Sequence, residues 1–328
     1  MDDNDLFLAM DVGGTNVKAG LVDSRGRILS RRHFPTSSSR PPVEVINDMV
    51  AHLKALAAEA PAGRGAASLA IGMPGWLNQA EGLLINAPNM PGWSNVPMAD
   101  IFGRAMNMPV RLENDTNAYA VGEWLYGAGR GLANLIVVTL GTGVGGGLIL
   151  EKKLWSGSFA SAVEIGHIPL ALDGALCGCG RRGCLETIAS ATGMRRLGRE
   201  WLLAGKPSLY EGRPDELTTK AMVDLARDGD EMSLQVFKEA GRALGRVLAD
   251  IFNLLGLEGA VIGGGAAGAF EYLEPDIREI LAERLIVAEP EGVKILRSQL
   301  GEDAPLAGGA ALLTGRGLQR PRAPLSPK

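Results

Sequence analysis

The sequence predicts an α/β protein of two domains. Its 328 residues are enough for two domains of ordinary size. Apolar runs that end in glycine turns alternate with stretches of helical period, which is typical of α/β proteins. Two of these runs, AMDVGGTNVKAGLV and VVTLGTGVGGGLIL, resemble each other and fall in different halves of the chain. A duplicated domain, each copy giving a phosphate-binding hairpin to a shared cleft, would produce this repeat.

Composition and charge exclude several classes of protein. Hydrophobic residues make up 46% of the chain and charged residues 21%, so a sizeable core can form without disulfides. The net charge of −4 argues against a nucleic-acid-binding surface, which needs a basic patch. The sequence contains no run of 18 apolar residues, so we expect no membrane-spanning helix. The N-terminus, MDDNDLFLAMDVGG, is acidic where a signal peptide is basic, so we expect a cytoplasmic protein.

The first half of the chain reads as strands, helices and one long loop. Apolar runs predict a hairpin of strands 6–12 and 16–23, and a buried strand at 68–75. Apolar residues at helical spacing predict a helix over 43–60, which Pro61 and Gly63 end. Residues 76–98 are rich in Pro, Asn and Gly, so we expect a long loop, and its two tryptophans favour a functional one.

The second half repeats this alternation. The expected elements are a strand, acidic turn and helix within 109–127, a glycine hairpin within 134–150, a loop-rich stretch over 156–190, a helix over 231–256, a strand over 259–265 and a helix over 305–313. The tail 317–328 is Pro-rich and without apolar period, so we expect disorder there.

Three glycine turns follow apolar strands and are candidate phosphate sites. Backbone N–H groups in such turns can approach phosphate oxygens closely because no Cβ intervenes, and a threonine hydroxyl adds a donor. The alternative is hairpin turns that need a positive φ. The turns are Gly13, Gly14 and Thr15; Gly141, Thr142 and Gly143; and Gly263, Gly264 and Gly265.

Two other nucleotide motifs are rejected. Gly141, Gly143 and Gly146 fit the dinucleotide pattern G-x-G-x-x-G, but that pattern needs a helix after the turn. The residues that follow, LILEKKLW, predict a strand instead. No glycine turn is followed by Lys and then Ser or Thr, so the P-loop pattern is also absent.

An acidic turn, Glu113-Asn114-Asp115, follows a predicted strand. Phosphoryl transfer to an alcohol needs a carboxylate that takes the hydroxyl proton, and Asp115 could supply it. The alternative is that Asp115 or Thr116 only caps the following helix. Asp11 poses the same question, since it could hold a Mg²⁺-bound water or merely stabilise the first glycine turn.

A cluster of one histidine and three cysteines predicts a structural zinc site. His167, Cys177, Cys179 and Cys184 lie within 18 residues, separated by glycines, and this set suits a tetrahedral Zn²⁺. The alternative is three free thiols, but no apolar run would bury them. Glu164 and Glu186 flank the cluster, and their carboxylates could accept hydrogen bonds from sugar hydroxyls. Their alternative role is ordinary surface charge.

Together these segments resemble the ROK family of bacterial sugar kinases and repressors. DVGGTNVKAGLVD resembles its nucleotide turn, LENDTNAYAVGEW its catalytic-aspartate segment, VVTLGTGVGGGLIL its second glycine turn and AVIGGG its third. EIGH followed by CGCGRRGCLE is similar to its sugar-and-zinc signature, the most specific of the set. The resemblance covers about residues 5 to 313.

The resemblance implies an actin-like ATPase fold, ribonuclease H-like and hexokinase-type, with ATP and Mg²⁺ in an interdomain cleft. It implies a discontinuous N-terminal domain of residues 1–115 and about 301–328, closed by the returning last helix. The large domain, 116–300, would carry the zinc loop and a homodimer interface.

By the same resemblance, Asp115 would be the catalytic base. Nucleotide contacts would come from Asp11, Gly13, Gly14, Thr15, Asn16, Lys18, Gly141, Thr142, Gly143, Gly264 and Gly265. Sugar contacts would come from Gly75, Asn89, Asn114, Asp115, Glu164, His167 and Glu186, and zinc ligands from His167, Cys177, Cys179 and Cys184.

The chain departs from the family pattern just before its Glu-x-Gly-His motif. Ala160 and Val163 stand where glycine is expected, which bears on sugar preference more than on reaction type. The family's repressors carry a DNA-binding domain before the first glycine turn, and a strand that begins near residue 6 leaves no room for one.

We therefore expect an ATP-dependent kinase of a free hexose, glucose first, acting on O6. N-acetylmannosamine, N-acetylglucosamine and fructose are alternative substrates, and a catalytically silent sugar sensor is a further alternative. We also expect zinc removal to weaken sugar binding but to change ATP binding little, because the glycine turns lie elsewhere in the sequence.

Overall fold

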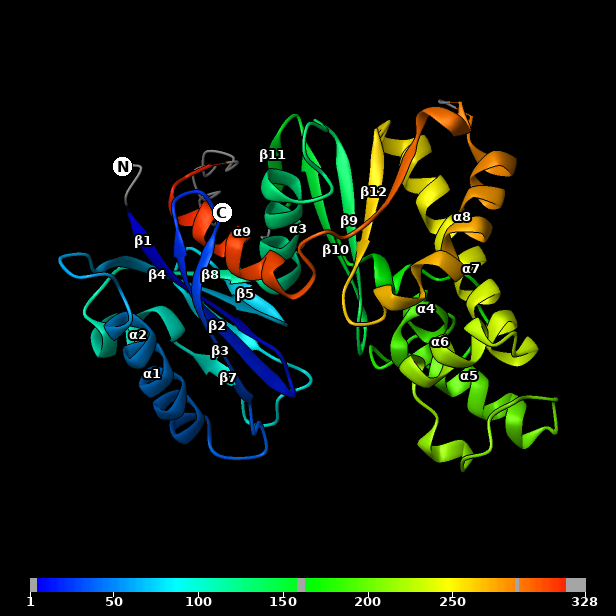
Figure 1. The fold of residues 1–328 in the computed structure, drawn as a ribbon, viewed down its shortest axis with the longest axis horizontal. Helices are drawn as coiled ribbons and strands as arrows, with labels where there is room; N and C mark the ends of the chain where they lie inside the picture. Colours follow the sequence, from blue (N-terminus) through cyan, green and yellow to red (C-terminus); the bar gives the residue numbers. More distant parts are fainter. Residues whose placement is uncertain (1–4, 158–162, 287–288, 317–328) are drawn as a thin grey trace, which may run out of the picture. The chain divides into compact units, whose positions relative to one another are not determined.

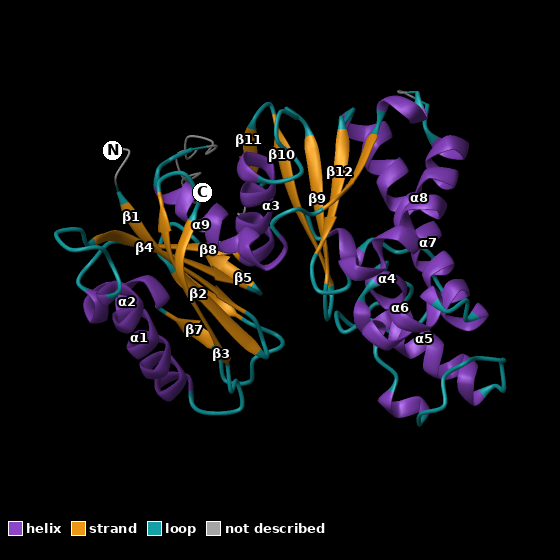
Figure 2. Cartoon of the chain, viewed as in Figure 1, coloured by secondary structure: helices purple, strands orange, loops and turns teal. Residues whose placement is uncertain are grey.

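The computed structural model describes residues 5–157, 163–286 and 289–316. The chain divides into two compact units by its internal contacts. Unit 1 comprises residues 1–125, 148–162 and 303–328, and unit 2 comprises 126–147 and 163–302. Two five-stranded sheets and their helices account for most of the fold (Figure 1; Figure 2). The domain limits that the sequence analysis placed at 115 and 301 stay a prediction.

The first sheet has the strand order β3-β2-β1-β4-β8. Its β1–β2 and β2–β3 pairs are antiparallel, and its β1–β4 and β4–β8 pairs are parallel. The predicted hairpin over 6–23 is confirmed. The strands are β1 (Leu6–Val12), β2 (Asn16–Asp23), β3 (Ile28–Pro35), β4 (Ala66–Met73) and β8 (Val110–Asn114).

The second sheet has the order β11-β10-β9-β12-β13, which is the order of the first sheet repeated. In each sheet a glycine turn joins the first two strands in sequence, which supports the predicted internal repeat. Strand β10 follows the turn at Gly141 directly, so the dinucleotide pattern lacks the helix it needs. The strands are β9 (Leu135–Leu140), β10 (Val144–Leu150), β11 (Lys153–Trp155), β12 (Gly259–Gly263) and β13 (Lys294–Arg297).

Local capping explains where the longest helix begins and ends. The Asp230 carboxylate accepts the Ser233 N–H at 2.8 Å, and Gly256 ends the helix with a φ of 62°. The predicted helices over 43–60, 231–256 and 305–313 are confirmed as α1, α7 and α9. The helices are α1 (Pro42–Ala58), α2 (Met98–Met106), α3 (Asp115–Tyr126), α4 (Glu186–Ala189), α5 (Ala191–Leu203), α6 (Thr219–Arg227), α7 (Glu231–Leu255), α8 (Phe270–Arg284) and α9 (Ala304–Leu313).

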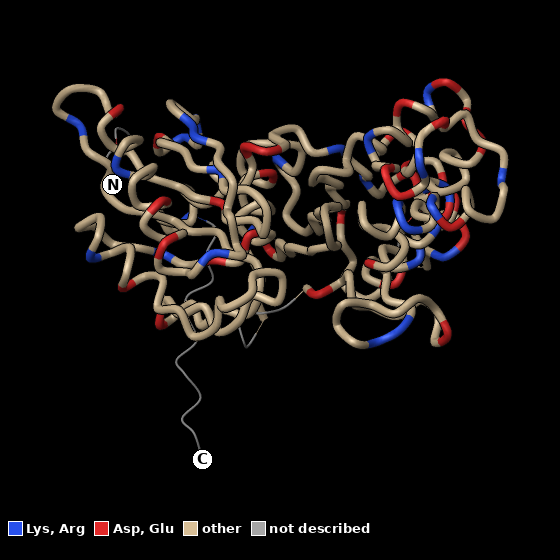
Figure 3. Tube along the Cα trace, turned by 90° about the horizontal axis from the view of Figure 1, so that it is seen from below, with Lys and Arg blue, Asp and Glu red and all other residues tan. Residues whose placement is uncertain are grey.

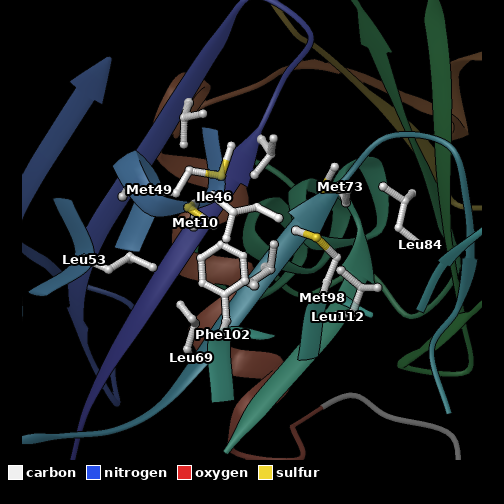
Figure 4. Close-up of a cluster of buried hydrophobic side chains, with 14 of the residues drawn as sticks. Met10, Ile46, Met49, Leu53, Leu69, Met73, Leu84, Met98, Phe102 and Leu112 are labelled. Carbon is white, nitrogen blue, oxygen red and sulfur yellow. The ribbon is translucent and has the colours of Figure 1, made fainter. Parts of the chain in front are cut away.

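The sheet of unit 1 is covered on both faces. On one face, residues of β1 and β4 such as Met10 and Leu69 pack with Met49 of α1 and Phe102 of α2 (Figure 4). On the other face, Leu306 of α9 packs on Phe7 and Ala9 of β1. In such sheets ligands bind at the carboxyl ends of the parallel strands, which here are Val12 of β1, Met73 of β4 and Asn114 of β8.

Two glycines fix helix α3 against α9. A Cβ on Gly122 would lie 2.1 Å from the Ala304 carbonyl oxygen, and one on Gly308 would lie 1.8 Å from the Ala118 oxygen. Only glycine permits this approach. The contact holds α3, whose first residue is Asp115, firmly within unit 1.

The expectation of a long loop over 76–98 is wrong. These residues form a small sheet of β5 (Trp76–Asn78), β6 (Leu83–Asn86) and β7 (Ser94–Val96). Strands of three or four residues are too short to show a period in the sequence. Trp93 is fully buried in the core of unit 1, so it gives no evidence for function, whereas Trp76 is exposed.

Within the described ranges, no helix has both the length and the apolar character that crossing a bilayer requires. The tail for which disorder was predicted, 317–328, lies outside the described residues, and so does Ala160.

Candidate functional site

The first glycine turn directs its N–H groups away from Thr36 and Ser38, the residues that bind its carbonyl oxygens. The carbonyl oxygens of Gly13 and Gly14 accept the hydroxyls of Thr36 and Ser38 at 2.6 and 3.0 Å, and the Thr15 carbonyl accepts the Thr36 N–H. In a trans peptide the C=O and N–H bonds point in opposite directions. The N–H groups that follow these carbonyls are therefore directed away from residues 36 and 38, as an anion site requires.

The backbone dihedral angles of this turn do not explain why glycine occupies positions 13 and 14. Gly13 and Gly14 are absent from the glycines with positive φ, which removes the alternative that they only make a left-handed turn. A Cβ on Gly14 would meet the chain only at ordinary contact distance, 3.5 Å from the Asn89 oxygen. Asn16 begins β2 at the end of the same turn, and Lys18 lies opposite Asp11 in the β1–β2 ladder.

Asp11 and Asp115 flank Gly72 at the carboxyl ends of three adjacent parallel strands. Gly72 pairs with Asp11 of β1 on one side and with Glu113 of β8 on the other. A Cβ on Gly72 would lie 3.7 Å from Asp11 Oδ1 and 3.5 Å from Asp115 Cα. The sheet therefore brings the Asp11 carboxylate and the Asp115 backbone to a position where no side chain intervenes.

Asn114, not Asp115 or Thr116, caps helix α3. The Asn114 Oδ1 accepts the Asn117 N–H at 3.1 Å, which is the usual N-cap bond. Asp115 Oδ1 accepts the adjacent Thr116 N–H at 2.8 Å and the Thr116 hydroxyl at 3.5 Å. Although Asp115 is half-buried, loss of hydration at its carboxylate raises its pKa. A raised pKa brings a carboxylate closer to the proton affinity that a general base needs.

Glu113 is a site-forming residue that the sequence analysis missed. Its side chain is 2% exposed and accepts hydrogen bonds from side chains on three sides. Arg111 Nη2 donates at 3.0 Å and Asn117 Nδ2 at 3.0 Å, and Gln79 Nε2 also donates. Its Oε1 further accepts the Asn114 N–H at 3.1 Å. Glu113 thereby joins the turn before Asp115 to the β5–β6 connection.

Gly75 directly precedes β5 of the small sheet, and Asn89 lies in the connection between β6 and β7. Gly75 has a φ of 102°, and its Cβ would stand 2.3 Å from the Asn86 oxygen. This close packing explains the glycine without any ligand, so a sugar contact by Gly75 remains only a prediction. Asn89 is exposed and its backbone lies beside Gly14. The structure thus brings the predicted sugar residue Asn89 to the first glycine turn.

The second and third glycine turns end neighbouring strands of the second sheet. Strands β9 and β12 are parallel, with Thr139 opposite Gly263. Gly264 has a φ of 85° and abuts Leu140, whose carbonyl also accepts the Ala266 N–H at 2.8 Å. Gly264 is therefore required by the fold. Gly141 and Gly265 have neither positive φ nor any atom within 4 Å of an added Cβ, so both turns offer open backbone at one edge.

The predicted zinc ligands converge. One ligand atom from each of His167, Cys177, Cys179 and Cys184 lies within 4.8 Å of the others. Cys179 Sγ is 3.8 Å from Cys184 Sγ, and Cys177 Sγ is 3.5 Å from His167 Nδ1. Tetrahedral zinc with bonds of about 2.3 Å to sulfur and about 2.05 Å to nitrogen would separate these pairs by about 3.8 and 3.6 Å. The four residues therefore fit zinc, with Nδ1 as the histidine ligand.

The three thiols have unequal proton affinities. Burial raises the pKa of Cys177 to about 12 and also raises that of Cys184. The Arg181 backbone N–H lowers the pKa of Cys179 to about 6. Cys179 is therefore the thiolate at neutral pH, and zinc would displace the protons of the other two.

Glu186 lies against the second glycine turn, where the sequence analysis did not place it. Its Oε2 accepts the Val144 N–H at 3.0 Å, and a Cβ on Gly143 would lie only 2.3 Å from that oxygen. Its Oε1 is 3.5 Å from Cys177 Sγ. We expected zinc removal to change ATP binding little because the glycine turns lie elsewhere in the sequence. That reason is wrong for the turn at Gly143, because residues distant in sequence are in contact here.

Glu164 and Val163 precede the short 3₁₀ turn η1 (Ile165–His167). Val163 has a φ of 71°, a conformation that is an outlier for a β-branched residue. Its carbonyl oxygen and Cγ1 would lie 2.7 and 2.8 Å from a Cβ on Gly146. Position 163, where the sequence analysis expected glycine, thus has a backbone that suits glycine, although valine occupies it.

A cavity of about 350 Å³ lies elsewhere in unit 2, next to α7 and α8. Three arginines line it, but Arg242 pairs with Glu279 and Arg284 pairs with Asp250. Acidic and basic positions both occur in this helical part of unit 2 (Figure 3). Because the charges are largely compensated, the cavity has none of the phosphate-binding character of the glycine turns.

Comparison with known proteins gives a consistent result. The ROK family matches residues 7–316. A glucokinase of Thermotoga maritima is 34% identical over 94% of this chain and 98% of its own length, and an N-acetylmannosamine kinase of Escherichia coli is 31% identical over 95% and 99%. The crystal structure of a ROK family glucokinase from Streptomyces griseus, in complex with glucose and AMPPNP, is 33% identical with a TM-score of 0.79 over 94% of this chain and 98% of that one. Its fold is the actin-like ATPase fold, which the two repeated sheets of this chain share. The chain belongs to the ROK family.

Proposed function

We propose that this protein is an ATP-dependent hexose kinase that transfers the γ-phosphoryl group to O6 of glucose. The observation that carries the proposal is Asp115, a carboxylate with a raised pKa at the carboxyl end of β8, beside Asp11 and not used as a helix cap. The glucokinase relatives and the glucose and AMPPNP complex of the S. griseus enzyme support the choice of substrates.

The proposed mechanism is in-line transfer between two held substrates. The Asp115 carboxylate accepts the proton of the sugar hydroxyl and orients its oxygen toward the γ-phosphorus. The backbone N–H groups of the glycine turns hold the triphosphate, with Thr15 and Thr142 donating hydroxyls. Asp11 is the residue that would hold, through a water, the Mg²⁺ that accompanies ATP, and this ion would supply neutralisation of the phosphate charge.

The proposed sugar contacts are Asn89, Asn114, Asp115, Glu164, His167 and Glu186. His167 has Nδ1 directed to the cysteines, so its Nε2–H is the nitrogen left to donate to a sugar oxygen. Zinc held by His167, Cys177, Cys179 and Cys184 would have four protein ligands and supply no chemistry beyond ordering this loop. We further propose a cytoplasmic homodimer, and three free thiols agree with a reducing compartment.

N-acetylmannosamine is the second candidate substrate. The E. coli relative that phosphorylates it, by its name, is 31% identical to this chain, nearly as similar as the glucokinases. Val163, next to Glu164, is one of the two positions, with Ala160, where this chain has no glycine although the family resemblance leads one to expect it, so the sugar loop is where the preference would differ.

The test is ADP release with a panel of free sugars: glucose, mannose, fructose, N-acetylglucosamine and N-acetylmannosamine. We expect glucose to give the highest kcat/KM. A preference for an N-acetylated sugar would change the substrate but keep the reaction. Sugar binding by calorimetry without ADP release from any sugar would instead indicate a silent sensor.

A further inference from the structure

The loop that carries the cysteines holds Val144, the residue directly after the second glycine turn, from two sides. The Val144 N–H donates to Glu186 Oε2 at 3.0 Å. On its other side, a Cβ on Gly166 would lie 2.2 Å from the Val144 carbonyl oxygen. Gly166 stands between Glu164 and His167 in the predicted sugar-and-zinc signature, so both contacts come from segments that adjoin the four predicted zinc ligands.

Further contacts extend this connection. Glu186 Oε1 lies 3.5 Å from Cys177 Sγ. The Glu186 carboxylate therefore contacts Val144, just after the second glycine turn, with one oxygen and the predicted zinc ligand Cys177 with the other. The Ala191 N–H, at the start of α5, donates to the Gly141 carbonyl at 2.9 Å. The turn is thus held at its first residue and just after its last by segments that follow the cysteines.

We propose that Val144 links the cysteine loop to nucleotide binding, so that nucleotide affinity depends on the loop being held by zinc. Glu186 and Gly166 are then positioning residues for the second glycine turn. The link rests on the proposed function only in taking that turn as a nucleotide site. Coupling of two binding sites is reciprocal, so nucleotide must also strengthen the hold on zinc by the same factor.

The first test reads the nucleotide site when the loop is altered. Gly166→Ala forces a Cβ into the Val144 carbonyl, whereas Gly178→Ala, between two cysteines of the same loop, places its Cβ in open space without a positive φ. Calorimetric titration with ADP, without sugar, measures the affinity. We expect Gly166→Ala and chelator-treated wild type to raise the Kd for ADP about tenfold, a typical coupling, and Gly178→Ala to leave it unchanged.

The second test reads the zinc site when the turn is altered. Gly143→Ala displaces Glu186 Oε2, whereas a Cβ on Gly141 meets nothing within 4 Å. Competition with a chromogenic chelator measures zinc affinity. We expect Gly143→Ala to lower zinc affinity about tenfold, a typical coupling. Gly141→Ala should have the zinc affinity of the wild type. Adding ADP should raise the zinc affinity of the wild type.

Equal Kd values for ADP in zinc-loaded and zinc-depleted folded protein, with circular dichroism confirming the fold, would overturn the link. So would a Gly143→Ala protein that binds zinc as tightly as Gly141→Ala. Neither result would touch the proposed reaction, which fails only if no sugar is phosphorylated. The two failures are therefore distinguishable.

Discussion

Asn114 caps helix α3 through a 3.1 Å bond from the Asn117 N–H, and this leaves the adjacent Asp115 carboxylate out of the cap. The division separates two roles that the sequence alone could not assign. Asn114 is the N-cap residue of α3, while the Asp115 carboxylate accepts the neighbouring Thr116 N–H next to Gly72, at the carboxyl end of the sheet.

Asp115→Asn should lower kcat by roughly 10²- to 10⁴-fold, the usual contribution of a general base. The amide keeps the shape and the bond from Thr116, so sugar affinity should change little. Steady-state kinetics with sugar calorimetry measures both. Asp100→Asn on α2, where the exposed carboxylate only pairs with Arg104, is the control and should behave as wild type. A near-normal kcat in Asp115→Asn would remove Asp115 from the mechanism.

The acid limb of the kcat/KM profile, which reports the free enzyme, should lie above the ordinary aspartate pKa of about 3.9. Burial raises the pKa of Asp115, so its carboxylate takes up a proton at a higher pH than a solvated one. Activity should therefore be lost as pH falls through this raised value and be regained above it. Initial rates across pH 4 to 8 measure the limb. If the same limb persists in the residual activity of Asp115→Asn, another group is titrating.

Glu113→Gln should destabilise unit 1 and lower kcat more than it changes the KM for sugar. The buried carboxylate accepts hydrogen bonds from Arg111, Gln79, Asn114 and Asn117, and all four partner groups are donors. The amide of Gln would have to direct its own N–H groups at one of these donors, which leaves both unsatisfied. A loss of about 1–3 kcal/mol is expected for such a mismatch. Thermal unfolding and kinetics check it, with the exposed Glu81→Gln in the same β5–β6 connection as the control. Wild-type stability in Glu113→Gln would show that the network contributes nothing.

Val163→Gly should raise stability, because glycine accepts a φ of 71° without the penalty that valine pays. A strained residue of this kind costs of order 1–3 kcal/mol, and glycine's greater freedom in the unfolded chain offsets part of the gain. Val163→Ala separates dihedral strain from side-chain size, since alanine keeps most of the strain. Melting temperatures of the three proteins should rank glycine above valine, with alanine gaining little. An equal gain from alanine would point to crowding by the side chain instead.

The sequence predicted best those features that are local. Gly13, Gly141 and Gly264 each follow an apolar strand, and the structure has a turn at each place. The cysteine spacing likewise predicted a cluster that the fold assembles. The contacts of Glu113 with Gln79 and of Glu186 with Val144 join residues 34 and 42 positions apart, and no local pattern indicates such pairs. Short strands within 76–98 were missed for the related reason that pairing, not period, creates them.

The most direct test of the proposed function is the phosphorus-31 NMR spectrum of a reaction of the purified protein with glucose, ATP and Mg²⁺. Transfer to O6 predicts a phosphomonoester signal that grows with ADP and splits into a triplet by coupling to the two protons on C6. The signal should be absent without sugar and strongly reduced with Asp115→Asn. A spectrum in which ATP yields only inorganic phosphate, or remains unchanged with every sugar that binds, would contradict the assignment of this protein as a hexose kinase.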